Sequence, residues 1–346
     1  MKIGIPKEIK TSESRVALVP AACLELVQCG HEVIGQTGCG LLSGYPDKEY
    51  TDAGCRMVDF IQEVYAEAQL IIKVKEPQPE EYPLIKKHHS LFCYLHLAAE
   101  PELTEVLKNS GAIAIAFEEV TDAHGNLPLL KPMSMIAGKL SAQYASVYLH
   151  SHYSGRGVLM DSIANAEQAK VTVLGYGVSG TAAAEHFANM GAALTIVDKN
   201  QEKLSLAKQL SNNVTTLNAI SDDIETAIIN SDVVIGAVLV SGARAPIVVQ
   251  EDWVKNMHKG AVIIDIAVDQ GGCIATTKPT TYEEPTFILH DVVHFGVQNM
   301  PAAVPRTASQ LLSNAILPAV KILAENKWRD DENIFAGLVV ENGVLV

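Results

Sequence analysis

The sequence has little of what marks several large classes of protein. Only 5% of its 346 residues are aromatic and 19% are charged, and 26 basic residues stand against 40 acidic ones, so the formal net charge is -14. Such a charge repels a phosphate backbone, so nucleic acid is not expected as a partner. No apolar run approaches the roughly 18 to 20 residues that span a bilayer, and the opening MKIGIPKEIK has no apolar signal segment. We therefore expect a soluble cytoplasmic protein with no membrane partner.

The cysteines indicate neither a disulfide framework nor a metal site. No two of the six form a CxxC pair, and they are spread along the chain: Cys23, Cys29, Cys39, Cys55, Cys93 and Cys273. Without a secretory signal, such cysteines indicate free thiols. His290, Asp291 and His294 could present metal ligands at helical spacing, but they form no recognised signature, so no metal is expected.

The length and the apolar content favour two domains. A chain of 346 residues is longer than one core usually organises, and 48% hydrophobic residues are enough to bury ample surface. Short apolar runs alternate with helical segments twice, which predicts parallel sheets covered by helices on both faces. The first stretch predicts strands at 1–5, 31–37, 70–74, 90–95 and 112–117, with helices at 21–28 and 101–110. The second predicts strands at 171–175, 193–198, 232–238, 261–268 and 286–290, with helices at 179–190 and 201–210.

Two long helices flank the second stretch. One is expected from Met133 to about His152, and the other follows Arg306 and is interrupted or kinked at Pro318. The flanking helices suggest that residues 131–306 are inserted between 1–130 and 307–346. We thus expect an α/β protein of two Rossmann-like domains with parallel sheets, two hinge connections and a cleft between the domains.

The most specific motif is the glycine-rich segment Gly175-Tyr176-Gly177-Val178-Ser179-Gly180, which follows a predicted strand and opens a predicted helix. Gly175 suits the tight turn, Gly177 lets the backbone approach a pyrophosphate, and Gly180 permits close packing of helix on strand. The helix N-terminus adds N–H groups and partial positive charge. These features predict a dinucleotide site in the inserted domain.

Asp198 ends the next predicted strand, 23 residues after Gly175. A carboxylate at this spacing accepts hydrogen bonds from the adenosine ribose and repels a 2'-phosphate, so NAD is favoured over NADP. Lys199, the residue after Asp198, could allow some NADP to bind. The alternative is a glycine-rich turn with Asp198 as an ordinary strand end.

Three polar residues of the first domain follow predicted strands. Arg15 follows the first strand, Lys75 follows 70–74, and His96 follows 90–95. Ligands of open parallel sheets lie beyond the carboxyl ends of the strands. An Arg and a Lys suit a carboxylate and a His exchanges protons near neutrality, so together they predict a pocket for a small carboxylic acid. Taken singly, each could be a solvated loop charge or a structural histidine.

Asp269 is the candidate acid on the cofactor side. It follows the apolar run 261–268 and precedes Gln270-Gly271-Gly272-Cys273. A glycine-containing loop could carry its carboxylate to the nicotinamide end of the dinucleotide site, although Asp before Gly-Gly is also common turn chemistry. Asp265 is the rival, but a position inside an apolar strand favours a buried structural contact.

Eight segments together resemble the alanine dehydrogenases of the alanine dehydrogenase/pyridine nucleotide transhydrogenase family, over nearly the whole chain. They are GIPKEIKTSESRVALVP, KVKEPQPEEY, YLHLAA, LLKPMSMIAG, VLGYGVSG, VIGAVLV, IDIAVDQGGC and VQNMPAAVP. The resemblance implies reversible, NAD-dependent oxidative deamination of L-alanine to pyruvate and ammonia, in L-alanine catabolism, by a homohexamer.

The resemblance also implies residue roles. Arg15 and Lys75 would bind the substrate, and His96 and Asp269 would be the acid/base pair. The cofactor would be held by Ser134, Gly175, Gly177, Val178, Ser179, Gly180, Asp198, Lys203, Val238, Leu239, Ile266, Ala267, Val268, Asp269, Lys278, Val297, Gln298, Asn299 and Met300.

The sequence departs from the family pattern in three places. Ala219 stands where a serine often contacts the adenosine, and Lys278 stands where an arginine is common. These changes affect the expected adenosine contacts. The C-terminal segment ENIFAGLVVENGVLV is shorter than usual, which bears on the subunit number.

Three rival functions remain. One is a saccharopine- or opine-type dehydrogenase on the same scaffold, joining an amino acid to a keto acid. Another is the soluble NAD-binding part of a transhydrogenase, which is disfavoured because that relative lacks the DQGGC-type acid. The third is a non-catalytic NAD-binding relative, against which the presence of Arg15, Lys75, His96 and Asp269 argues.

Overall fold

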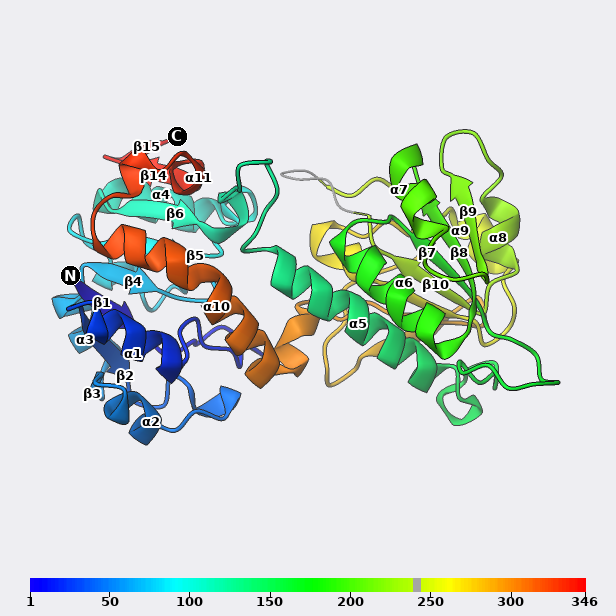
Figure 1. Cartoon of the computed structure of the whole chain (residues 1–346), viewed down its shortest axis with the longest axis horizontal. Helices are drawn as coiled ribbons and strands as arrows, with labels where there is room; N and C mark the ends of the chain where they lie inside the picture. The colour runs from blue at the N-terminus through cyan, green and yellow to red at the C-terminus, as the bar shows by residue number, and fades with distance from the viewer. Residues whose placement is uncertain (239–243) are drawn as a thin grey trace. The chain divides into compact units, whose positions relative to one another are not determined.

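The structure is a computed structural model of the chain that describes residues 1–238 and 244–346. It divides into two compact units, Met1–Met133 with Ala302–Val346 (unit 1), and Ser134–Pro301 (unit 2) (Figure 1). The chain enters unit 2 within helix α5 (Lys131–Tyr148) and returns within the 3-10 helix η7 (Met300–Ala303). Unit 2 is therefore continuous in sequence, whereas unit 1 is built from both ends of the chain. The boundaries predicted from the sequence, 131 and 306, lie within a few residues of these transitions.

Unit 1 contains an eight-stranded sheet in the order β15-β14-β6-β5-β4-β1-β2-β3. Six strands, β1 to β6, are parallel, and β14 and β15 are antiparallel additions at one edge. Their bounds are β1 Lys2–Ile5, β2 Glu32–Gln36, β3 Arg56–Val58, β4 Leu70–Ile72, β5 Ser90–Cys93, β6 Ile113–Ala116, β14 Leu338–Glu341 and β15 Val344–Leu345. The order reverses between β1 and β4, and such a switch point is where α/β sheets bind ligands.

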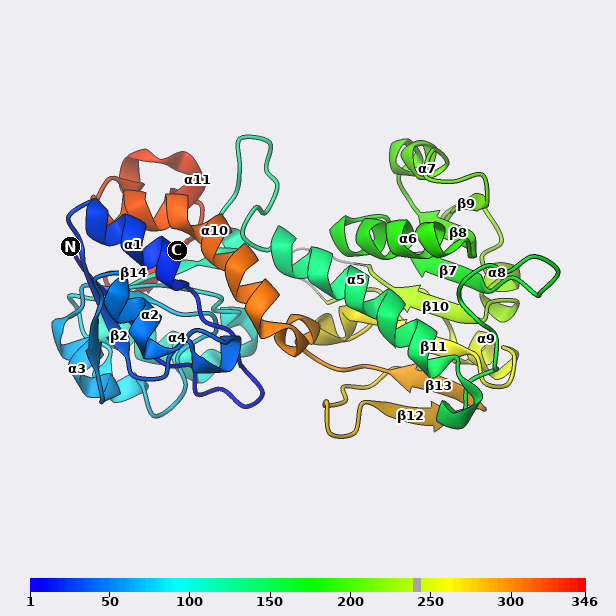
Figure 2. The same cartoon turned by 60° about the horizontal axis from the view of Figure 1, so that its bottom comes forward.

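The helices of unit 1 cover both faces of its sheet. They are α1 Pro20–Gln28, α2 Asp47–Asp52, α3 Ile61–Glu67, α4 Pro101–Ser110, α10 Pro305–Ala324 and α11 Glu332–Phe335. Apolar residues of α3 and α4 pack with the strands in one core cluster, while α1 and α10 contact each other on the opposite face (Figure 2). Burial on both faces explains why β4 is a continuous apolar run instead of alternating.

Unit 2 contains a seven-stranded sheet in the order β12-β13-β11-β10-β7-β8-β9, with β12 alone antiparallel. The strands are β7 Lys170–Leu174, β8 Ala193–Asp198, β9 Val214–Asn218, β10 Val233–Gly236, β11 Val262–Asp265, β12 Thr286–Leu289 and β13 Val292–Phe295. The six parallel strands have the 3-2-1-4-5-6 order of dinucleotide-binding folds, with the switch point between β7 and β10. The expected α/β fold with two Rossmann-like sheets is confirmed.

The helices of unit 2 are α5, α6 Val178–Met190, α7 Gln201–Ala207, α8 Glu225–Ile229 and α9 Glu251–Lys255. Ile228 of α8 and Val254 of α9 pack with β7, β10 and β11 in one core cluster. Helix α5 approaches α6 closely, since a Cβ on Gly138 would lie 2.1 Å from the carbonyl oxygen of Ser179. Short 3-10 helices complete the chain: η1 Leu41–Ser43, η2 Tyr82–Leu84, η3 Leu97–Ala99, η4 Phe117–Glu119, η5 Ser151–Tyr153, η6 Ile266–Gln270 and η8 Trp328–Asp330.

Most predicted elements are confirmed, and one predicted strand is too long. The strand predicted at 261–268 ends at Asp265, because the carboxylate of Asp265 accepts the Ala267 N–H and starts η6. Helix α10 continues through Pro318 without interruption, while a kink there stays a prediction; its buried apolar face offsets the roughly 3 kcal/mol that an internal proline costs. His294 lies in strand β13, not on a helix. The described residues contain no group of three potential metal ligands, and no described helix could cross a membrane.

Two buried histidines are fixed in their neutral form. His294 lies between the Thr276 hydroxyl, 2.8 Å from its Nε2, and the Val292 carbonyl, 3.0 Å from its Nδ1. His89 contacts the Tyr65 carbonyl through Nε2, and its Nδ1 accepts the Lys86 N–H. Burial lowers the pKa of each imidazole to about 4. The hydrogen bond to a backbone carbonyl raises the pKa, but by less than burial lowers it.

Acid should therefore weaken the fold. Each histidine takes up a proton near pH 6.5 when unfolded but only near pH 4 when folded, so stability is complete above pH 6.5 and falls as the pH drops towards 4. When the pH falls from 7 to 5, each histidine should lower the unfolding free energy by about 2 kcal/mol. His294→Asn, which cannot titrate, should reduce this pH dependence by about half in urea unfolding. The exposed His124→Asn is the control, and an unchanged slope in His294→Asn would contradict the assignment.

Candidate functional site

The glycine-rich segment lies between β7 and α6, at the switch point of the sheet in unit 2. Gly175 has a φ of +90°, which favours glycine, and a Cβ on Gly180 would lie 1.8 Å from the Gly175 carbonyl oxygen. A Cβ on Gly177 would meet no protein atom within 4 Å, so this side of the loop is open. The first N–H groups of α6, from Val178, Ser179 and Gly180, lack partners inside the helix. The loop therefore fits a pyrophosphate.

Asp198 connects this loop to the end of β8. One carboxylate oxygen accepts the Tyr176 N–H at 2.7 Å, and the other accepts the Asn200 N–H at 2.8 Å. The side chain is half-buried, and its position beside the glycine-rich turn is the one that a ribose-binding carboxylate requires. Asp198 thus fixes the loop that would hold the pyrophosphate and remains partly accessible.

The other predicted cofactor residues of unit 2 follow the neighbouring parallel strands. Val238 follows β10, the residues from Ile266 to Asp269 form most of η6 after β11, and the residues from Val297 to Met300 follow β13. The Asn299 N–H lies 3.4 Å from an Asp269 carboxylate oxygen, which connects the last two loops. Leu239 lies outside the described residues. These loops come together because the carboxyl ends of parallel strands lie at one edge of the sheet.

Three predicted residues lie on helices or beyond the strand ends. Ser134 is in the first turns of α5 and Lys203 is in α7. The Lys278 ammonium lies 4.6 Å from the centre of the Phe287 ring. Ala219, in place of the serine common in the family, lines an open cavity of about 460 Å³ together with Asp222 and Trp253.

Asp265 is the buried residue that shapes the Asp269 loop. Its carboxylate accepts the N–H groups of Ala267 at 3.0 Å, Cys273 at 2.9 Å and Ile274 at 3.2 Å. Burial raises the pKa of Asp265, and these hydrogen bonds oppose the rise. The expectation of a structural contact for Asp265 agrees with this arrangement, while Asp269 itself is exposed.

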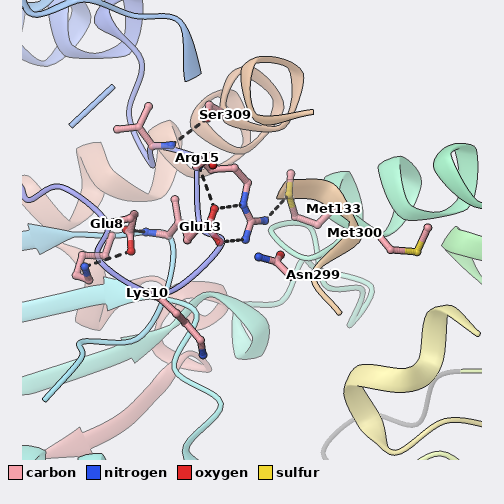
Figure 3. A network of polar contacts seen from close by, with 12 residues as sticks. Glu8, Lys10, Glu13, Arg15, Met133, Asn299, Met300 and Ser309 are labelled. Carbon is pink, nitrogen blue, oxygen red and sulfur yellow. Dashed lines mark hydrogen bonds and ion pairs between the residues drawn. The ribbon is translucent and has the colours of Figure 1, made fainter. Parts of the chain in front are cut away.

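In unit 1, Arg15 is buried beside Glu13 in the loop after β1 (Figure 3). The Arg15 Nε donates to Glu13 at 2.7 Å, its Nη2 contacts the second oxygen of the same carboxylate, and its Nη1 lies 3.2 Å from the Met133 sulfur. Burial disfavours the charge, but Glu13 outweighs it and raises the pKa of Arg15. The two contacts with Glu13, through Nε and Nη2, fix the orientation of the guanidinium.

Lys75 lies in the loop after β4, next to a buried ion cluster. The Lys73 ammonium lies 3.2 Å from Glu8 and 3.1 Å from Glu81, and Glu8 also accepts the Val74 N–H at 2.6 Å. Burial opposes the charge of Lys73, yet the two carboxylates raise its pKa. This cluster fixes the backbone immediately before Lys75, which is half-buried.

His96 follows β5 and has a left-handed backbone, with φ 47° and ψ 42°. Its ring stacks parallel to Tyr94 at 6.0 Å between centroids, and its Nδ1 lies 3.5 Å from a Glu118 carboxylate oxygen. Arg15, Lys75 and His96 therefore follow β1, β4 and β5, which are neighbours in the sheet at its switch point. The carboxyl ends of the three strands that precede the predicted residues therefore lie at one edge of the sheet, and a shared pocket stays a prediction.

Family models match both parts of the chain. The model described as "Alanine dehydrogenase/PNT, N-terminal domain" matches residues 4–137, and "Alanine dehydrogenase/PNT, C-terminal domain" matches residues 141–346. The chain belongs to the alanine dehydrogenase/PNT family. Within it, the chain is 44% identical to an alanine dehydrogenase of Halomonas elongata over 350 residues, covering 100% of this chain and 94% of the relative.

Two solved structures share the fold of this chain but differ in their sequence identity to it. An L-alanine dehydrogenase has a TM-score of 0.96 and 45% identity, covering 100% of this chain and 97% of that one. A transhydrogenase from Sinorhizobium meliloti has a TM-score of 0.87 at 22% identity, covering 100% and 99%, which shows the shared fold alone. The sequence is thus much more similar to that L-alanine dehydrogenase than to that transhydrogenase.

Sequence reasoning missed the carboxylates that hold the site residues in place, Glu8, Glu13, Glu81 and Glu118. Glu13 could have been suspected, since it lies two residues before Arg15. Glu81 lies only six residues after Lys75, whereas Glu8 and Glu118 are distant in sequence and the sheet order brings them near Lys75 and His96.

Asp265→Asn should loosen the Asp269 loop. Replacing the charged acceptor with an amide that presents an N–H to backbone donors should cost about 2 kcal/mol of unfolding free energy, measured by urea unfolding. Hydrogen exchange at Cys273 and Ile274 should accelerate. The exposed Asp269→Asn in the same loop is the control and should change stability by less than about 0.5 kcal/mol. Equal stability and equal exchange in Asp265→Asn would contradict this role.

Proposed function

We propose that this protein is an NAD-dependent alanine dehydrogenase that interconverts L-alanine and NAD with pyruvate, ammonia and NADH. The observation that carries the proposal is 44 to 45% identity to alanine dehydrogenases over the whole chain. The geometry of each unit supports it independently, because polar residues suited to an amino acid and to a dinucleotide follow the strands at the two switch points.

Unit 1 would hold the amino acid. Its carboxylate would meet the guanidinium of Arg15, with Lys75 adding a second positive charge. Glu13 keeps the guanidinium in one orientation, and the ion cluster around Lys73 keeps the loop of Lys75 in place. A site fixed before substrate arrives loses little entropy on binding.

Unit 2 would hold NAD, with the pyrophosphate at the N–H groups of α6 and the adenosine ribose at Asp198. NAD supplies the hydride acceptor. Oxidation of the Cα–H bond gives an iminium, which water attacks to form a carbinolamine that collapses to pyruvate and ammonia. Protons must leave the amine and the water and return to the departing nitrogen, so we assign these transfers to His96 and Asp269.

The remaining expectations are proposals of the same kind. The six cysteines are all free thiols, which supports a reducing compartment such as the cytoplasm. A homohexamer remains what family membership suggests.

The deciding assay follows NADH absorbance with NAD and L-alanine, and with pyruvate and ammonium in reverse. Lysine, glutamate and saccharopine are tested in parallel. Turnover that requires a second amino acid would select the saccharopine- or opine-type alternative. NAD binding without turnover on any substrate would select the non-catalytic relative.

His96→Ala or Asp269→Asn should lower kcat for L-alanine about 100-fold or more, the typical contribution of acid/base catalysis. NAD binding, measured by calorimetry, should persist in both variants because neither change removes the glycine-rich loop or Asp198. Full turnover in either variant would remove that residue from the mechanism.

Asp198→Ala should weaken NAD binding about 10-fold or more, since it removes a charged acceptor and the bond to the Tyr176 N–H. Its preference for NAD over NADP should narrow, because the charge that repels a 2'-phosphate is lost. The Michaelis constants for both cofactors measure this. Asp252→Ala, an exposed carboxylate of the same unit, is the control; unchanged selectivity in Asp198→Ala would contradict the role.

A further inference from the structure

Glu118 and His96 come from neighbouring strands of unit 1. Strands β5 and β6 are paired in parallel, with Cys93 opposite Ala116. The chain continues from β6 directly into η4, which carries Glu118, and from β5 through Tyr94 and Leu95 to His96. The side chain of Glu118 is 13% exposed and that of His96 is 46% exposed. A largely buried carboxylate therefore lies beside the exposed imidazole that we assign to proton transfer.

The Glu118 carboxylate holds the backbone at this point. It accepts the Leu95 N–H at 3.1 and 3.2 Å and the His96 N–H at 2.6 Å. His96 is in the left-handed region, a conformation that is unfavourable for a residue other than glycine. The hydrogen bonds to Glu118 offset that cost and fix the position from which the imidazole projects.

The same carboxylate also faces the ring. The Oε1 that accepts the His96 N–H lies 3.5 Å from Nδ1, which is longer than a normal N–H···O bond and acts as a close electrostatic contact. A carboxylate on the Nδ1 side favours the tautomer with a proton there and stabilises the imidazolium. It also leaves Nε2 as the nitrogen directed away from Glu118.

Two further contacts restrict the ring. Tyr94 stacks on it with an interplanar angle of 3°, and the Tyr94 hydroxyl donates to the Leu129 carbonyl at 2.7 Å, so the stacking surface is itself anchored. The imidazole is thus held against a fixed aromatic plane with one edge towards a carboxylate.

We infer that Glu118 is the positioning residue for His96, fixing its backbone, orienting its Nδ1 and stabilising its protonated form during proton transfer. The inference rests on the proposed function, in which His96 exchanges protons with the substrate. It assigns to Glu118 an electrostatic role that a purely structural side chain would not have.

Other titratable groups that interact with Glu118 are Cys93, Tyr94 and Glu119, and Lys75 follows β4, the strand beside β5. Burial raises the pKa of Cys93 and of Tyr94, so both are neutral at the pH of the reaction. The positive charge of Arg15, which interacts with Tyr94, is balanced by Glu13 in a buried ion pair. Glu119, the next carboxylate on η4, is exposed and interacts with Glu118.

Glu118→Gln separates the two roles, because an amide oxygen can still accept a backbone N–H but carries no charge. We expect kcat for L-alanine to fall about 10-fold with the Michaelis constants for L-alanine and NAD changed less than about 3-fold. The limb of the kcat/KM pH profile controlled by His96 should move to lower pH by about one unit, because loss of a neighbouring negative charge favours the neutral ring. Glu118→Asp, which keeps the charge, should restore the limb towards its original position.

Glu119→Gln is the matched control, since it removes the same charge from the same 3-10 turn at an exposed position; kcat and the pH profile should stay as in the parent protein. A histidine titration followed by NMR, with the His96 signal assigned from His96→Gln, gives a readout independent of turnover. Its midpoint should fall in Glu118→Gln and not in Glu119→Gln.

Three results would overturn the inference. One is an unchanged pH limb and NMR midpoint in Glu118→Gln. Another is an equal loss of kcat in Glu118→Gln and in Glu119→Gln. The third is a loss of kcat in Glu118→Gln that comes with a lower melting temperature but with no shift of the pH limb or of the NMR midpoint. If the parent protein does not oxidise L-alanine but the NMR midpoint still falls in Glu118→Gln, the proposed function fails while the pairing of Glu118 with His96 stands.

Discussion

Carboxylates that accept backbone N–H groups fix almost every loop that carries a predicted site residue. The Glu8 carboxylate accepts the N–H of Val74, just before Lys75, and the Glu118 carboxylate accepts the N–H groups of Leu95 and His96. In unit 2, the Asp198 carboxylate accepts the Tyr176 N–H of the glycine-rich turn, and the Asp265 carboxylate accepts three N–H groups around the Asp269 loop. Loops beyond strand ends have backbone donors that the sheet does not satisfy, and a buried charged acceptor satisfies them strongly. Each of these loops is therefore fixed by a carboxylate that accepts its backbone N–H groups.

The same arrangement explains how unit 1 tolerates charge in its interior. Arg15 and Lys73 are almost fully buried, and each lies against carboxylates that are buried with it. Removing one partner would leave an uncompensated charge, a larger loss than the pair itself contributes. Such ion pairs are weak evidence for stability, but they orient a guanidinium and a loop well. For a site that must present cations to a small zwitterion, this orientation is the functional gain.

Much of the architecture could be predicted from the sequence. Buried parallel strands appear as short apolar runs, so β1, β5 and β8 lie where the runs indicate, and the helix predicted at 101–110 has the bounds of α4. The roles of Gly175 and Gly180 also follow from sequence, since steric requirements there exclude a Cβ. The end of β11 could not be predicted, because the Asp265 carboxylate that accepts the Ala267 N–H is also held by the N–H groups of Cys273 and Ile274, eight and nine positions later.

The sequence alone determined the chemistry available at each strand end: an arginine, a lysine, a histidine and two aspartates in the family pattern. Tertiary structure alone decided which of them share an edge and which acids hold them. Sheet order is the physical reason, since β1, β4 and β5 are neighbours although tens of residues separate them, and the pairing of β5 with β6 brings Glu118 to His96. Apolar patterning specifies that a strand is buried, but long-range hydrogen bonding selects its neighbour.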